Sequence, residues 1–493
     1  MIGEMLEAVV VIITVVFTVP VLASSYYSMI LLLSSFRYPK MDKGSRKLTK
    51  FPVVSILVAT YNEKFVISRT LDALIALEYP KDNLQVIIAD DSTDETRTIV
   101  DDKIEQFHKS GVDSSISRRT ARNGFKSGAL NEAAQLVKGE YVLLLDADSI
   151  VTPEVLTRGL KTFEDQSDVA FVSFRVGHYN REQSIITRLF ALSLDLGDTL
   201  AKMGAYAINS PFSFQGGFTL ISTKTLKDVG YWSNNSIVDD ADLSCKVYAS
   251  GRRGVYLSDV RIFGEDPQTL ETWKKQAARV SQGWANCVST HWRTILHTPH
   301  MSRWRRIALL LFLLGPFASL SWIVVSFVSA LAVVLQISSA SGSIFSSPWY
   351  ILFISVPISA YFISAAYSLR IQRIMTGRNL LLIPLLSYTG YCMLTASSLG
   401  FLNGLIGRSG FFFRTPKSGE GRGSAETDYF RSLTFGKVAV VEAVLSVAAL
   451  VISILVMIDG VWFLGLTLLG FGLLTLKSMN LSRLLPSNMR GSR

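Results

Sequence analysis

Two aspartates separated by a single residue, Asp146 and Asp148, form the pair in this sequence best suited to bind a metal ion. They follow the apolar run 141–145. Residues i and i+2 of an extended chain point to the same side, so both carboxylates can contact one hard divalent cation, Mg²⁺ or Mn²⁺. Ser149 and Thr152 also fit the start of a helix, so the pair could instead be a helix cap. We expect metal and diphosphate binding.

A second group of acids, Asp239, Asp240 and Asp242, falls within four residues. At the start of a helix these acids could simply complement the helix dipole. Alternatively, one carboxylate held beside others and partly desolvated has a raised pKa and can serve as a general base. We expect this second role for Asp240.

Cations and polar side chains elsewhere in the sequence complement these acids. Lys126 lies in a loop before an expected helix, whose first amides could also receive an anion, although a lone lysine is often only solvated. Gln276 and Arg279 share one face of a later helix. Trp284 on that helix suits stacking against a sugar, or anchoring at a bilayer surface.

The elements that must position these residues are short apolar runs alternating with helical stretches. The runs cover 53–59, 84–89 and 141–145, and each ends in polar residues. Apolar strands separated by helices predict an α/β fold with a parallel-rich, Rossmann-like sheet, whose ligands bind beyond the carboxyl ends of the strands. No glycine-rich signature follows any run, which disfavours a dinucleotide cofactor or P-loop chemistry.

Composition places this module in a membrane. The chain has 493 residues, of which 49% are hydrophobic and 18% charged, with a net charge of +10. This excludes a disordered chain and a small disulfide scaffold. Cys245, Cys287 and Cys392 fit no metal or disulfide spacing, so we expect them to be packing residues. The cations cluster beside apolar segments, which favours an anionic membrane surface over nucleic acid as the partner.

The apolar segment 8–33 is long enough to cross a bilayer. A cleaved signal peptide is disfavoured, because Glu4 and Glu7 precede the segment and the cations follow it. Further apolar segments cover 307–336, 349–369, 380–405, 438–458 and 461–476. Glu442 is the one ionisable residue clearly inside a span, and we expect it to extend toward the interface.

Segment 380–405 does not fit a single crossing. A crossing would put the following cations, among them Arg408 and Arg414, outside the cell, against the positive-inside rule. Gly390, Gly400 and Gly404 permit bends, so we expect a re-entrant or interfacial pair of short helices. A single crossing that breaks the rule is the alternative.

The expected organisation therefore has six parts in a multi-pass protein of the cell membrane. They are an N-terminal transmembrane helix (1–36), a cytoplasmic α/β domain (48–300), transmembrane helices with the re-entrant segment (301–405), a cytoplasmic membrane-proximal loop (406–436), a transmembrane hairpin (437–477) and a cytoplasmic tail (478–493).

Seven segments occur in an order that resembles the polytopic family 2 glycosyltransferases, the cellulose synthase-like group. They are TYNE (60–63), DDSTD (90–94), KSGALN (126–131), DAD (146–148), QGG (215–217), DDADL (239–243) and QAAR (276–279). The segment FFFRTPK (411–417) looks like the membrane-proximal segment of that group. The resemblance covers nearly the whole chain.

This resemblance implies a metal-dependent, inverting glycosyltransferase with a GT-A-like fold that uses a UDP- or GDP-sugar. It implies that Asp240 is the catalytic base and that Asp146 and Asp148 bind Mg or Mn. The residues that it places at the nucleotide sugar are Thr60, Glu63, Asp90, Lys126, Asp146 and Arg279. Those that it places at the acceptor are Gln215, Gly216, Asp239, Gln276 and Trp284.

Two departures from the family pattern concern the acceptor. Asp239 stands where the family usually has Glu, and Val280 stands where polymer-forming members have Trp after Gln-x-x-Arg. We expect transfer to a growing polysaccharide, with single transfer to a lipid or polyprenyl phosphate as the alternative. A membrane transporter with a non-catalytic nucleotide-binding module is a more distant alternative. The sequence does not specify the sugar, the linkage, protein partners or the oligomeric state.

Overall fold

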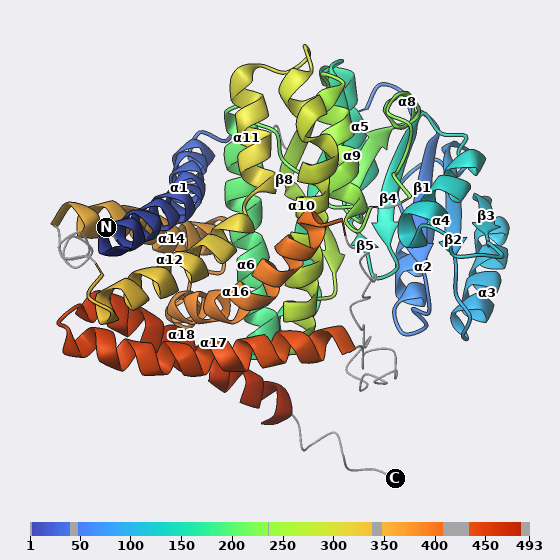
Figure 1. Cartoon of the computed structure of the whole chain (residues 1–493). Helices are drawn as coiled ribbons and strands as arrows, with labels where there is room; N and C mark the ends of the chain where they lie inside the picture. The colour runs from blue at the N-terminus through green and yellow to red at the C-terminus, as the bar shows by residue number, and fades with distance from the viewer. Residues whose placement is uncertain (1, 40–47, 235, 338–347, 408–432, 485–493) are drawn as a thin grey trace, which may run out of the picture.

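The computed structural model describes the chain except for residues 1, 40–47, 235, 338–347, 408–432 and 485–493. An α/β domain packs beside a group of long helices formed by both ends of the chain (Figure 1). The segment 411–417 lies outside the described residues, so its predicted cytoplasmic placement stays a prediction.

The three strands predicted from apolar runs are confirmed. They are β1 (Val54–Thr60), β2 (Leu84–Asp90) and β4 (Tyr141–Asp146), and both β2 and β4 pair with β1 in parallel. Eight strands form one sheet in the order β3-β2-β1-β4-β7-β6-β8-β5. The other strands are β3 (Asp113–Ser117), β5 (Ile150–Val151), β6 (Val169–His178), β7 (Thr219–Ser222) and β8 (Arg253–Gly264).

The strand register explains why the polar segments meet. Ala59 of β1 pairs with Asp146 of β4, and Thr60 pairs with Asp90 of β2. The three strands therefore end at the same edge of the sheet. This edge is the expected position for a ligand site in a parallel-rich sheet.

Helices cover both faces of the sheet, because alternate strand residues point to opposite sides. Ile56 and Val58 pack with helices on one face, whereas Leu57 packs with helices on the other. The first face is covered by α2 (Ile67–Ile75), α3 (Thr96–Lys109) and α5 (Val155–Asp165). The second is covered by α4 (Phe125–Ala133), α8 (Thr223–Asp228) and α9 (Asp239–Ala249).

Two helices lie between the sheet and the apolar helices, α6 (Ile185–Gly197) and α10 (Leu270–His297) (Figure 1). Helix α6 continues as a π-helical segment, η4 (Asp198–Gly204), and then α7 (Ala205–Ala207). Gly204 packs against the N-terminal helix α1 (Ile2–Ser35), because a Cβ at this glycine would lie 2.1 Å from the carbonyl oxygen of Leu31.

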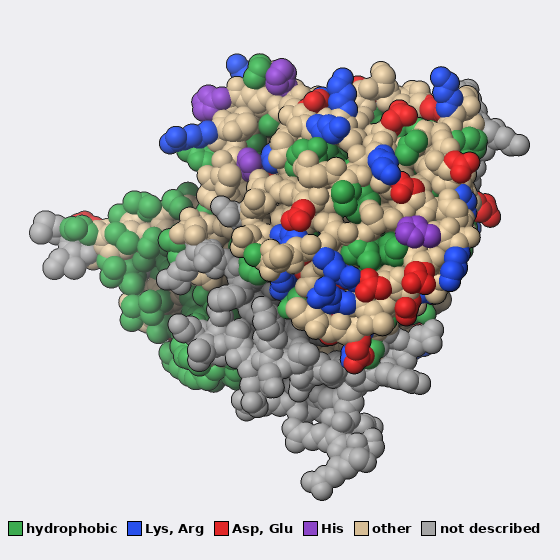
Figure 2. Space-filling view, turned by 90° about the vertical axis from the view of Figure 1, so that its right-hand side faces the viewer, with side chains coloured by type: hydrophobic (Ala, Val, Ile, Leu, Met, Phe, Trp, Pro, Cys, Tyr) green, Lys and Arg blue, Asp and Glu red, His purple; other side chains and the backbone are tan. Residues whose placement is uncertain are grey.

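Five helices in the described part of the chain are long and apolar enough to cross a membrane: Gly3–Ser35, Phe317–Val334, Gly377–Leu405, Val438–Ile458 and Trp462–Met479. Large hydrophobic side chains on α1, among them Ile12 and Val19, are exposed. Hydrophobic side chains gather on the part that projects from the molecule, whereas the α/β domain carries mixed charges (Figure 2). The orientation of these helices in a membrane stays a prediction.

The predicted hairpin at 437–477 consists of α17 (Leu433–Ile458) and α18 (Trp462–Leu484). Gly460 between them has a φ of 82°, a left-handed conformation that glycine adopts without strain. Helix α14 (Pro348–Ile371) and the short α15 (Gly377–Leu380) precede the hairpin in the chain.

The apolar segment 307–336 is divided between two helices. It forms α11 (Arg303–Leu313) and α12 (Phe317–Val334). Gly315 and Pro316 separate them, and proline cannot donate the backbone hydrogen bond that would continue α11.

Residues 380–405 do not form the predicted pair of short helices. Residues 382–405 form one continuous helix, α16 (Leu382–Leu405). Gly400 and Gly404 lie inside this helix and let it approach α10 closely. A Cβ at Gly400 would lie 2.2 Å from the carbonyl oxygen of Ala278, and one at Gly404 would lie 2.3 Å from that of Gln282. The expectation that residues 380–405 are re-entrant or interfacial stays a prediction.

Glu442 does not extend toward the membrane interface, as we had predicted from the sequence, but pairs with a lysine inside the protein. Its two carboxylate oxygens lie 3.0 and 2.9 Å from Nζ of Lys274 on α10, and Ser478 of α18 also accepts a hydrogen bond from this amine at 2.9 Å. The side chains of Glu442 and Lys274 are buried. The buried pair therefore joins the C-terminal hairpin to α10.

The α10–α16 contact can be tested with two glycines of α16. Gly400→Ala should lower the thermal unfolding temperature by several degrees, because overpacking a tight contact costs about 1–3 kcal/mol. Gly390→Ala is the matched control, since a Cβ at Gly390 meets nothing within 4 Å. Thermal unfolding of the purified protein in detergent measures both, and equal unfolding temperatures would contradict the close packing.

Candidate active site

A cavity of about 500 Å³ opens at the carboxyl edge of the sheet and extends to α6, α10 and α11. It brings together twelve of the thirteen residues expected at a functional site. They are Thr60, Glu63, Lys126, Asp146, Asp148, Gln215, Gly216, Asp239, Asp240, Gln276, Arg279 and Trp284. Segments that are far apart in the sequence therefore share one cavity.

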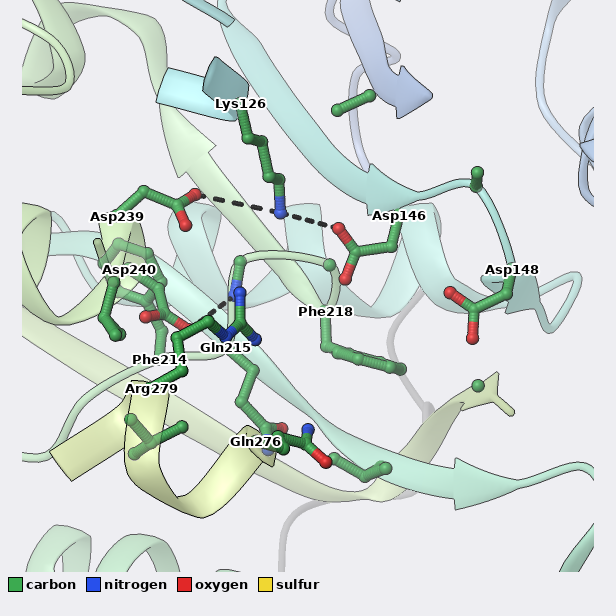
Figure 3. Close-up of a pocket in the computed structure, with 18 of the residues that line it drawn as sticks. Lys126, Asp146, Asp148, Phe214, Gln215, Phe218, Asp239, Asp240, Gln276 and Arg279 are labelled. Carbon is green, nitrogen blue, oxygen red and sulfur yellow. Dashed lines mark hydrogen bonds and ion pairs between the residues drawn. The ribbon is translucent and has the colours of Figure 1, made fainter. Parts of the chain in front are cut away.

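Lys126 is the cation among the acids of this cavity. Its Nζ lies 2.6 Å from Oδ1 of Asp146 and 3.7 Å from Oδ2 of Asp239 (Figure 3). Burial alone would lower the pKa of Lys126, but the charges of these carboxylates outweigh burial and raise it. Lys126 therefore stays charged and links the end of β4 to the start of α9.

Asp146 and Asp148 do not cap a helix. Strand β5 follows them, and α5 begins only at Val155. Oδ2 of Asp148 accepts a hydrogen bond from the backbone nitrogen of Glu265 at 2.7 Å. Both carboxylates lie along the same cavity edge (Figure 3). The alternative interpretation of this pair as a helix cap is therefore wrong.

These residues fit a hard divalent cation. Asp146 and Asp148 offer only carboxylate oxygens, the ligands that Mg²⁺ and Mn²⁺ prefer. Gly217 leaves room beside this pair, since a Cβ there would lie 2.6 Å from Oδ2 of Asp146. The described residues contain no group of three or more His, Cys, Asp or Glu that could hold a metal. The remaining ligands of a cation would have to come from substrate oxygens or water.

The three acids at the start of α9 have different roles. Asp242 accepts hydrogen bonds from Ser233 at 2.6 Å and contacts His291 at 2.7 Å. Burial alone would raise the pKa of Asp242, but these contacts lower it. Asp242 is therefore a structural residue, whereas Asp239 and Asp240 line the cavity.

Asp240 has the environment expected of a base. Its Oδ2 accepts a hydrogen bond from the backbone nitrogen of Gly216 at 3.1 Å, and its Oδ1 accepts one from that of Ala241 at 2.8 Å. Burial and the neighbouring charge of Asp239 raise the pKa of Asp240 to about 6, although Lys126 opposes the rise. A carboxylate with this pKa is ionised near neutral pH and accepts a proton more readily than an ordinary aspartate.

Helix α10 contributes the wall opposite Lys126 and Asp146, with Gln276 and Arg279 (Figure 3). Gly283 packs closely on the loop before α9, because a Cβ there would lie 2.1 Å from Cγ2 of Val238. The next residue, Trp284, lies against Phe312 of α11 with ring centroids 4.5 Å apart. These two rings form an aromatic surface at one end of the cavity.

Asp90 is the site residue that the structure does not bring to the cavity. Its carboxylate is buried and accepts hydrogen bonds from Arg118 Nε and the backbone nitrogen of Ser92, both at 2.9 Å. The next residue, Asp91, lines the cavity instead and pairs with Arg119 at 2.5 Å. Asp90 therefore lies outside the lining of this cavity, and its assignment to the nucleotide sugar stays a prediction.

Several further residues line the cavity that we did not predict from the sequence. Arg122 lies over the ring of Tyr61, with its guanidinium carbon 3.4 Å from the ring centroid. The run of arginines around position 122 was an available signal for this cation. Asp198 and Lys202 of η4 also line the cavity, but nothing in the local sequence distinguishes them from an ordinary surface pair.

Residues 52–283 match the family described as glycosyltransferase like family 2. Glucomannan 4-beta-mannosyltransferase 1 of Oryza sativa subsp. japonica is 30% identical over 261 residues, covering 52% of this chain and 50% of that protein. Glucomannan 4-beta-mannosyltransferase 2 of Arabidopsis thaliana is 28% identical over 273 residues, covering 55% and 51%. The chain spans about half the length of the curated relatives it matches.

Among solved structures, the mannosyltransferase PcManGT of Pyrobaculum calidifontis, in complex with GDP-Man and Mn²⁺, has a TM-score of 0.53 and 20% sequence identity. The match covers 82% of this chain and 99% of that one. This likeness concerns the fold, and it confirms the GT-A-like architecture predicted for the α/β domain.

The raised pKa of Asp240 can be measured directly. Its carboxyl should take up a proton as the pH falls through about 6. Asp239→Asn should lower this pKa, because it removes the adjacent like charge. Difference infrared spectroscopy of the protonated carboxyl, with Asp240→Asn to assign the band, measures the shift. An unchanged titration in Asp239→Asn would contradict the proposed coupling.

Proposed function

The chain carries a glycosyltransferase domain of family 2 at residues 52–283, and from this premise we propose that it moves a sugar from a UDP- or GDP-sugar to a growing polysaccharide at a membrane. The observation that carries the proposal is the placement of Asp240 in one cavity with Lys126 and Arg279. A base and two diphosphate-binding cations are the groups that a direct displacement at a sugar carbon requires.

The donor end of the cavity comprises the ends of β1 and β2 and the start of α4. We assign Thr60 and Glu63 to the nucleoside, and Lys126 and Arg279 to the diphosphate. The stacked pair of Tyr61 and Arg122 supplies an aromatic face and a positive charge at the same end. Because the relatives are named mannosyltransferases and the similar structure contains GDP-Man, GDP-mannose is the first donor to test.

Asp146 and Asp148 would hold a divalent cation, Mg²⁺ or Mn²⁺, which neutralises charge on the diphosphate when bound. Lys126 contacts Asp146, so its ammonium group would also lie next to the negative charge of the bound diphosphate. As the bond between the anomeric carbon and the diphosphate oxygen breaks, Lys126 and Arg279 stabilise the negative charge of the departing nucleotide.

Asp240 accepts the proton of the acceptor hydroxyl while that oxygen bonds to the anomeric carbon. The backbone N–H of Gly216 holds one carboxylate oxygen, which fixes the direction of the base. The acceptor attacks opposite to the departing diphosphate, so one displacement inverts the configuration at the sugar carbon. No covalent intermediate on the protein is required.

The aromatic surface of Trp284 and Phe312 supports a polysaccharide acceptor. Trp284 lies one turn of α10 beyond Val280, the position where polymer-forming members carry tryptophan. An indole backed by a second ring can stack against a sugar ring. Val280 is the observation that favours the second candidate, single transfer to a lipid or polyprenyl phosphate.

We further propose that the protein is a multi-pass protein of the cell membrane whose α/β domain faces the cytoplasm, where sugar nucleotides are made. The five apolar helices support the membrane placement. Their order around the α/β domain supports the predicted division at residues 1–36, 48–300, 301–405 and 437–477.

Asp240→Asn tests the proposed base. Sugar transfer should fall by at least about 100-fold, because positioned proton transfer contributes about 10²–10⁴-fold to a rate. Nucleotide binding in the presence of Mn²⁺ should remain, since Asn keeps the shape of the side chain. Labelled GDP-mannose and UDP-glucose, followed in purified protein, measure both quantities.

Asp113→Asn is the matched control for this experiment. Asp113 is an exposed carboxylate that begins β3, at the opposite edge of the sheet. It should leave transfer unchanged. Full activity in Asp240→Asn would refute the assignment of the base.

Trp284→Ala tests the acceptor surface. It should shorten the polysaccharide product and raise the KM for acceptor, because the indole face that holds the growing chain is removed. Trp284→Phe should retain part of the activity. Gel analysis of products made from a labelled donor measures chain length, and wild-type products consisting only of single-sugar lipids would favour the second candidate.

A further inference from the structure

We propose that Lys202 is a positioning residue that turns the amide of Gln215 toward the acceptor hydroxyl, an inference that rests on the proposed function. Lys202 lies in the π-helical segment η4 and is 5% exposed. Its Nζ donates a hydrogen bond to Oε1 of Gln215 at 2.9 Å. Both residues line the cavity, on the side of α6.

The chemistry of lysine fixes which atom of the amide it contacts. An ammonium group has three donors and no acceptor, so Lys202 can bind only the carbonyl oxygen of Gln215. The amide cannot flip without losing this hydrogen bond. Nε2 of Gln215 is therefore directed away from Lys202, and none of the described residues accepts a hydrogen bond from it.

The neighbour of Gln215 connects this amide to the base. Gly216 donates its backbone hydrogen bond to Oδ2 of Asp240 at 3.1 Å. An acceptor oxygen at this point can accept a hydrogen bond from Nε2 of Gln215 and give its own proton to Asp240. The amide of Gln215 then donates a hydrogen bond to the hydroxyl oxygen, and the carboxylate of Asp240 accepts one from the hydroxyl hydrogen. Together they orient the hydroxyl.

Asp198 explains why Lys202 orients a neutral amide and does not bind a phosphate. Oδ1 of Asp198 lies 2.8 Å from Nζ of Lys202, and Oδ2 accepts hydrogen bonds from Tyr256 at 3.1 Å and from the backbone of Val176 at 3.2 Å. The positive charge of Lys202 is thus compensated within the protein. With Asp239 and Asp240 nearby, this wall suits an uncharged hydroxyl better than an anionic acceptor.

The π-helical geometry gives this pair its position. π-Helical turns are rare and occur frequently at functional sites. Here η4 joins α6 to α7 and places Asp198 and Lys202 on the cavity wall. Gly204 at its end is held against Leu31 of α1. The positions of Lys202 and Gln215 are therefore fixed from both the sheet and the first helix.

The experiment compares acceptor and donor kinetics of the full-length protein in detergent, with β-linked mannotetraose as the acceptor probe and labelled GDP-mannose or UDP-glucose as the donor. Lys202→Met should raise the KM for mannotetraose about tenfold, as expected for loss of one oriented hydrogen bond, with the KM for donor unchanged. Gln215→Glu keeps a partner for Lys202 but offers the acceptor no N–H donor, so it should raise the same KM.

The double change Asp198→Asn with Lys202→Met separates positioning from folding. It leaves no unpaired buried charge, so a purely structural role of Lys202 predicts recovery of the acceptor KM. Positioning predicts that this KM stays about tenfold raised. Lys138→Met is the control, because Lys138 pairs with Asp113 on the surface, before β4. It should match the wild type.

The outcomes distinguish this inference from the function on which it rests. Wild-type protein that turns over neither sugar nucleotide would overturn the proposed function. Wild-type transfer to polyprenyl phosphate but not to mannotetraose would overturn only the role of Lys202 and Gln215. Recovery of the acceptor KM in the double variant would do the same.

Discussion

The contact of Lys126 with Asp146 and Asp239 is the interaction on which the rest of the site depends. The parallel register of β1, β2 and β4 gathers acidic strand ends at one edge, and such a concentration of carboxylates repels itself unless a cation lies among them. Lys126 supplies that charge, donating a hydrogen bond to Asp146 at the end of β4 and forming an ion pair with Asp239 of α9. The charge of Asp239 raises the pKa of Asp240 and the charge of Lys126 lowers it. Asp240 therefore stays ionised near neutral pH but is more basic than an ordinary aspartate.

Much of this arrangement could be predicted from the sequence because it depends on local patterns. Apolar runs that end in polar residues predicted β1, β2 and β4 and the sheet edge at which the cavity opens. Asp90 shows the limit of this reasoning. Adjacent residues of a strand point to opposite faces, so the side chain that reaches a cavity depends on where the strand ends, and here that side chain is Asp91.

Features that depend on distant partners could not be predicted. Glu442 has the appearance of a stray charge in an apolar helix, and its partner Lys274 lies 168 residues earlier in the chain. Gly400 and Gly404 have the composition of a bend, yet they serve helix packing because α10 lies against them. Lys202 carries no local signal at all, since a π-helical turn has no distinctive sequence pattern and Gln215 reaches it only in the folded protein.

The contact between Gly204 and Leu31 has a practical consequence for work with the isolated α/β domain. A soluble fragment that begins after residue 48 would lack Leu31, and the turn that carries Asp198 and Lys202 would lose the surface against which it is built. Such a fragment would retain β1, β2 and β4, which form the proposed nucleotide end. Crystallisation or inhibitor screening with a truncated protein would therefore retain the proposed donor end of the cavity, whereas the proposed acceptor end would lack its support from the first helix.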